Sequence, residues 1–92
     1  MAIVTLRYWA AAKEAAGIAE ETISAGTLAE ALAAARGKAD DDERAKQNPR
    51  FRAVLARSSF LIDGTPVGSR APETVVLSDA AVIEVLPPFA GG

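Results

Sequence analysis

The first patterned segment of the chain alternates between two sets of side chains, as a half-buried strand does. Between Ile3 and Trp9, one alternating set is uniformly apolar and consists of Val4, Leu6 and Tyr8. β-Branched and aromatic residues suit a pleated surface with one buried face. We therefore predict a strand over Ile3–Trp9, with that apolar set facing the core.

Two helices are predicted in the following stretch, separated by a polar strand. Ala10–Ala16 comes before Gly17, which suits a left-handed C-terminal cap. Ile18–Ala25 has the polar pattern of an edge strand. The second helix opens with a capping box at Thr27-Leu28-Ala29-Glu30, in which the Thr27 hydroxyl can bond the backbone N–H of Glu30. It is expected to end at Gly37, and its apolar stripe consists of Leu28, Leu32 and Ala35.

The second half begins with Lys38–Gln47, which is almost entirely charged or alanine and is interpreted as a solvated excursion. Asn48-Pro49 then indicates the start of a third helix, which should stop near Arg57. Its buried face is predicted to carry Phe51, Val54 and Leu55.

Short strands and turns fill the remainder of the chain. Ser59–Ile62 is predicted as a strand, and Asp63-Gly64 as a hairpin turn leading into Thr65-Pro66-Val67. A turn-rich stretch precedes a short run from Thr74 to Leu77. The last strand is expected over Ala81–Leu86, because neither proline that follows can donate to a ladder.

This order of elements predicts an α+β roll. The first and last strands are both strongly apolar, so we expect them to pair at the centre of the sheet. About four to five strands and two to three helices are expected, with the helices packed on one face. With 92 residues, the chain has room for one core, so residues 1–92 are assigned to a single domain.

Composition narrows the chemistry open to such a domain. The net charge of −2 argues against a nucleic-acid partner, and no apolar run is long enough to span a membrane. The sequence holds no Cys and no His, the usual ligands of zinc, Fe–S and haem sites. We expect no metal site and no bound cofactor. A cytoplasmic protein with little side-chain chemistry of its own is predicted.

The last six residues offer a different kind of functional group. Pro87-Pro88 fixes φ twice and stiffens the exit from the last strand. Phe89 supplies an apolar anchor, and after Ala90 the final Gly91-Gly92 carries no Cβ. An arm of this kind suits a narrow tunnel in a partner protein, where the α-carboxylate of Gly92 would be the reacting group.

The sequence resembles the MoaD/ThiS sulfur carriers, which have the ubiquitin-like β-grasp fold. The resemblance covers nearly the whole chain: its opening is carried by Arg7-Tyr8-Trp9-Ala10 with Lys13-Glu14 and Gly17, and its second helix start by Thr27-Leu28. The ending Leu86-Pro87-Pro88-Phe89-Ala90-Gly91-Gly92 is similar to the family's signature and points to the MoaD branch. Trp9 stands where phenylalanine is more usual.

The resemblance implies a function that depends on partner proteins. An adenylating enzyme of the MoeB kind would use ATP to activate Gly92, and a persulfide donor would convert it to a thiocarboxylate. In the MoaD branch, Pro87, Pro88, Phe89, Ala90 and Gly91 would lie in a tunnel of the large, MoaE-like subunit of molybdopterin synthase. The sulfur would then pass to precursor Z in molybdenum cofactor biosynthesis. A heterotetramer with that subunit is implied by the resemblance only.

Other functions remain open on the sequence. The same carrier chemistry could serve thiazole (thiamine), cysteine or secondary-metabolite synthesis. Alternatively, Gly92 could form isopeptide bonds with lysines, as in a ubiquitin-like modifier, or the tail could be inert in an interaction module.

Three side chains near the first strand are candidates for a partner interface. Trp9 faces away from the predicted core, as an interface aromatic would, or else packs beneath a neighbouring helix or loop. Arg7 and Lys13 could meet acidic groups on the activating enzyme, although surface charges are more often simply solvated.

Overall fold

Five strands form one mixed sheet in the order β2-β1-β5-β3-β4. The structure is a computed structural model, and it describes residues 2–41 and 48–88. The elements are β1 (Ala2–Tyr8), α1 (Ala10–Ala16), β2 (Glu20–Ala25), α2 (Leu28–Asp41), α3 (Asn48–Arg57), β3 (Ser59–Ile62), β4 (Thr65–Pro66), the short 3-10 helix η2 (Pro72–Thr74) and β5 (Val82–Leu86).

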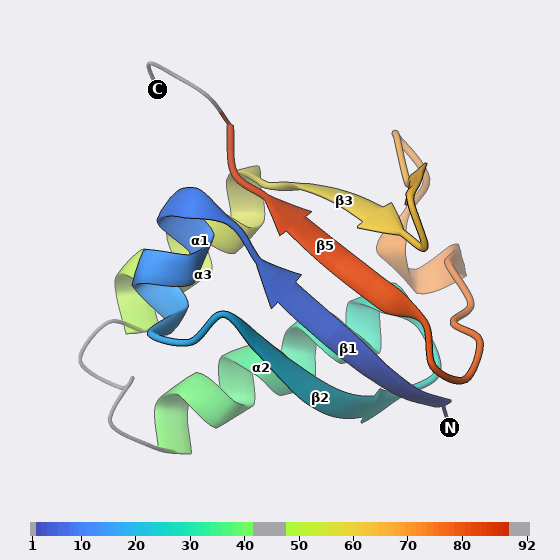
Figure 1. Ribbon diagram of the computed structural model, residues 1–92, viewed down its shortest axis with the longest axis horizontal. Helices are drawn as coiled ribbons and strands as arrows, with labels where there is room; N and C mark the ends of the chain where they lie inside the picture. Colours follow the sequence, from blue (N-terminus) through green and yellow to red (C-terminus); the bar gives the residue numbers. More distant parts are fainter. Residues whose placement is uncertain (1, 42–47, 89–92) are drawn as a thin grey trace.

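The first and last strands lie side by side at the centre of the sheet, as predicted (Figure 1). They are parallel, with a register from Thr5 opposite Val82 to Tyr8 opposite Val85. The other neighbours are antiparallel. The sheet therefore brings the C-terminal ends of β1 and β5 to the same edge, where the chain leaves for its tail.

Within the described residues, helices cover one face of this sheet and leave the other uncovered (Figure 1). Val4, Leu6 and Tyr8 point from β1 into the core beneath the helices and are essentially inaccessible to water. From β5, Ile83 and Val85 join them. The alternation in the sequence thus correctly predicted which face of β1 is buried.

The caps of the first two helices follow the predicted chemistry. Gly17 adopts φ 79°, and its N–H donates to the carbonyl of Lys13 at 2.9 Å. At the start of α2, the Thr27 Oγ1 accepts from the Glu30 N–H at 3.2 Å, while Glu30 Oε1 accepts from the Gly26 N–H at 2.7 Å. Each cap satisfies backbone groups that the helix itself cannot pair.

Several predicted boundaries are wrong by a few residues. The second helix does not end at Gly37: α2 continues to Asp41, because Gly37 has no left-handed φ and a mid-helix glycine costs only about 1 kcal/mol relative to alanine. The short run from Thr74 to Leu77 begins at the end of η2 and holds a single isolated bridge, between Val76 and Thr27. Residues 42–47 of the charged excursion lie outside the described residues.

The Thr27 cap gives a direct test of this local structure. Substituting Thr27→Ala removes the Oγ1 acceptor and is expected to cost about 1 kcal/mol, which lowers Tm by about 4–8 °C in a domain of this size. Thr27→Ser keeps the hydroxyl and should stay close to the unmodified protein. Thermal unfolding followed by circular dichroism measures both. Equal Tm values for Thr27→Ala and the unmodified chain would contradict the capping role.

Candidate functional site

The predicted functional tail starts where β5 ends. Leu86 is the last residue of β5, Pro87 is half-buried and Pro88 is exposed. The predicted tunnel-binding residues Phe89, Ala90 and Gly91, and the predicted reacting residue Gly92, lie outside the described residues. The structure therefore describes where the tail begins on the sheet. We call this point, Leu86 to Pro88, the root of the tail.

The chain around Trp9 holds the end of β5 against the end of β1. The Trp9 N–H donates to the carbonyl of Val85 at 3.2 Å, which continues the β1–β5 pairing one residue past β1. Beyond this point Pro87 and Pro88 have no N–H to donate, so they cannot extend the ladder. The sequence itself thus sets the position where the chain can leave the sheet.

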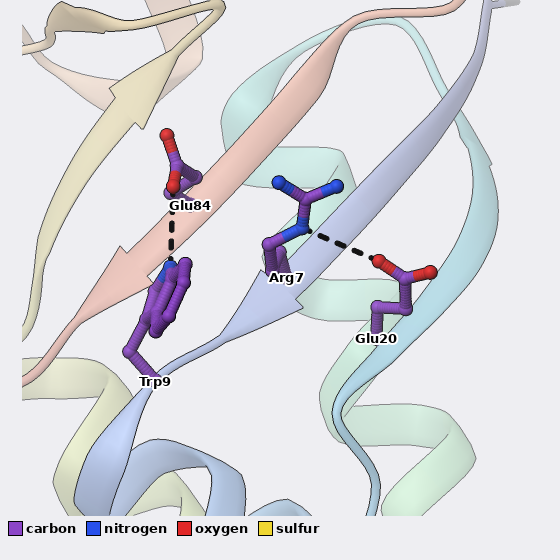
Figure 2. A network of polar contacts seen from close by, with 4 residues as sticks. All are labelled: Arg7, Trp9, Glu20 and Glu84. Carbon is purple, nitrogen blue, oxygen red and sulfur yellow. Dashed lines mark hydrogen bonds and ion pairs between the residues drawn. The ribbon is translucent and has the colours of Figure 1, made fainter.

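A row of polar contacts lies on the uncovered face beside this point (Figure 2). On β1, Arg7 Nε lies 3.3 Å from the Glu20 Oε2 of β2, and both side chains are about half exposed. Next to Arg7 in the register is Glu84 of β5, whose Oε1 accepts a hydrogen bond from the Trp9 indole Nε1–H at 3.2 Å. Three strands therefore contribute to one polar row.

The three predicted interface residues do not all belong to this row. Arg7 and Trp9 lie on the uncovered sheet face near the tail root. Trp9 is 45% exposed, so it does not pack beneath a helix or loop. Lys13 is exposed on α1 and is not part of the contacts in Figure 2. Because Arg7 is already paired with Glu20, its charge is partly compensated.

Glu84 is a residue of this row that was not among the predicted site residues. It is the single acidic residue of β5, flanked on both sides by Val82, Ile83, Val85 and Leu86. A lone glutamate within an apolar strand was a usable signal, because burial of such a residue is unfavourable unless its carboxylate reaches a partner or water. Its partner could not be found from the sequence, since Trp9 lies 75 positions away.

Two further features concern only the described part of the chain. No group of three or more metal-binding side chains gathers within it. Among its helices, none has both the length and the apolar character needed to cross a membrane.

The comparisons place the chain in a family. The ThiS family model matches residues 6–92, so the chain belongs to the ThiS family. Comparison with curated proteins gave no match.

Solved structures show the same fold. Small archaeal modifier protein 1 from Methanosarcina acetivorans has a TM-score of 0.78 at 24% identity, covering 100% of this chain and 98% of the other. The same modifier from Haloferax volcanii has a TM-score of 0.72 at 17% identity, covering 98% and 99%. A complex of subunits 1 and 2 of molybdopterin-converting factor from Helicobacter pylori gives 0.62 at 23% identity, covering 98% and 99%.

Family and fold together define the class of protein. The mixed sheet with helices on one face is the ubiquitin-like β-grasp fold, as the resemblance to the MoaD/ThiS carriers implied. The chain is therefore a ThiS family protein with this fold.

Proposed function

We propose that this protein is a sulfur carrier whose Gly92 α-carboxylate accepts and donates the sulfur, as the small subunit of a molybdopterin synthase. The observation that carries the proposal is the sequence Pro87-Pro88-Phe89-Ala90-Gly91-Gly92 following directly on a central strand. A rigid exit followed by residues without bulky side chains suits delivery of a carboxylate into a narrow site.

The proposed chemistry requires activation, because a carboxylate is a poor electrophile. Its oxygen attacks the α-phosphorus of ATP on a partner enzyme, and pyrophosphate leaves. A persulfide sulfur then attacks the acyl carbon of the adenylate, and AMP leaves. Cleavage of the remaining S–S bond by a thiol gives the thiocarboxylate. This chain supplies the acyl group and the docking surface, while ATP and the catalytic side chains belong to the partners.

Support for the molybdenum branch comes from two sources. The double proline of the ending resembles the MoaD branch. The fold is shared with subunit 1 of a molybdopterin-converting factor, which was solved in complex with its subunit 2. By analogy, the proposed partners are a large synthase subunit, an adenylating enzyme and a persulfide donor.

Intact mass after alkylation tests the proposal. The protein is incubated with an adenylating enzyme, ATP and a persulfide donor, and then treated with a thiol-alkylating reagent. Because the chain holds no Cys, a thiocarboxylate is the expected site of reaction. We expect one adduct, placed at Gly92 by fragmentation and absent when ATP is left out. An unmodified protein in the complete reaction would contradict sulfur carriage.

A second candidate function is protein modification. The chain superimposes on small archaeal modifier proteins with TM-scores of 0.78 and 0.72, above the 0.62 of the molybdopterin-converting factor. Both functions share the adenylate and differ in what attacks it: a persulfide sulfur for a carrier, a lysine amine for a modifier. Isopeptide-linked Gly92 peptides in cells, without a thiocarboxylate, would favour the modifier.

A further inference from the structure

We infer that Glu84 is a positioning residue that holds the Trp9 indole in place at the root of the tail, ready for the adenylating partner to dock. This inference rests on the proposed function for the identity of the partner. It concerns the contact between Glu84 Oε1 and the indole Nε1–H, 3.2 Å long, on the uncovered face of the sheet (Figure 2).

The backbone of Trp9 is fixed on both sides. Its N–H donates to the carbonyl of Val85 at 3.2 Å, and its carbonyl accepts from the Ala12 N–H at 2.9 Å, at the start of α1. Trp9 thus joins the last pair of the β1–β5 ladder to the first turn of a helix. With its backbone held in this way, rotation about the side-chain bonds is the freedom that remains to the indole.

The Glu84 carboxylate restricts that rotation. The indole N–H can only donate a hydrogen bond. Carboxylates are among the strongest acceptors for such a donor. Glu84 lies on β5 two residues before Leu86, the last residue before the prolines. The contact therefore links the side chain at the end of β1 to the strand from which the tail leaves.

A fixed indole matters because Trp9 is 45% exposed. Aromatic side chains supply much of the energy of protein interfaces, and a side chain already held in its bound conformation loses less entropy on binding. Releasing one such side chain weakens binding by about two- to tenfold. Neither Glu84 nor Trp9 supplies the carboxylate that reacts in the proposed function, so the chemical step itself should not change.

The experiment compares Glu84→Ala with Glu84→Gln, which keeps a side-chain oxygen acceptor at the same reach. Glu20→Ala is the matched control, because it removes the same charge from the same face but contacts Arg7 instead of Trp9. Trp9 is the chain's single tryptophan, so time-resolved fluorescence anisotropy reports on this one indole. ATP–pyrophosphate exchange with the adenylating enzyme, as a function of carrier concentration, gives KM and kcat.

Glu84→Ala is expected to increase fast indole motion and to raise KM by about two- to tenfold with kcat unchanged. Glu84→Gln and Glu20→Ala should both stay near the unmodified protein. The inference is overturned if Glu84→Ala leaves the anisotropy decay unchanged, if Glu84→Gln behaves like Glu84→Ala, or if Glu20→Ala raises KM equally. If the unmodified chain supports no exchange at all, the proposed function fails, while the anisotropy comparison still decides whether Glu84 holds the indole.

Discussion

Deletion of Gly92 is expected to abolish adenylation and sulfur transfer while leaving the fold intact. Removing one residue of an extended chain withdraws the terminal carboxylate by about 3.3–3.6 Å. Reacting groups must lie within about 3–3.5 Å of one another, and a displacement of about 1 Å already costs roughly 100-fold in rate. We therefore expect ATP–pyrophosphate exchange to fall by at least about 100-fold.

Stability measurements separate this loss from unfolding. Among the described residues, Val85 is the last one in the buried core, and Gly92 has no side chain that could add to it. Tm of the Gly92 deletion should differ from that of the full chain by less than about 4 °C. Gly92→Ala is the matched variant, since it keeps the chain length and the carboxylate but adds a Cβ. A deletion variant that still exchanges normally would rule out Gly92 as the reacting residue.

Much of the fold could be predicted because local patterns and global packing agree. Alternation in β1 predicted the buried set Val4, Leu6 and Tyr8, and two glycines marked turns that need a positive φ. Gly17 ends α1 at φ 79°, and Gly64 completes the hairpin turn at φ 85°. Consistency between local preference and tertiary structure is typical of natural sequences. The central pairing of the first and last strands followed from their shared apolar character.

Other features required information that local patterns do not contain. Gly37 looks like a helix end, but α2 passes through it, because the alanine-rich turns before it sustain the helix despite the cost of one glycine. The Trp9–Glu84 contact depends on the parallel register of β1 and β5, in which Arg7 lies opposite Glu84. The register between β1 and β5 is set by the packing of the whole sheet and not by the local pattern of either strand. The tail chemistry stays a prediction from the sequence.

Phe51 holds α3 on the sheet, and its substitution is expected to lower stability while sulfur transfer is kept. Its side chain is fully buried, and its ring meets that of Tyr8 edge to face, with centroids 5.5 Å apart and an interplanar angle of 82°. Phe51→Ala removes the ring contact and leaves a cavity, which costs about 3–5 kcal/mol. In a domain of this size, Tm should fall by at least about 12 °C.

Two variants show whether this loss comes from packing. Phe51→Leu keeps most of the apolar volume and should lose less stability, whereas Val76→Ala, at a side chain 78% exposed, should change the free energy of unfolding by no more than about 0.5 kcal/mol. Below its lowered Tm, Phe51→Ala should still accept sulfur, because Phe51 contributes to the core and the reacting carboxylate belongs to the tail. A Tm equal to that of Val76→Ala would show that α3 does not depend on this ring. Loss of sulfur transfer in a still-folded Phe51→Ala protein would instead show that the helix layer takes part in docking.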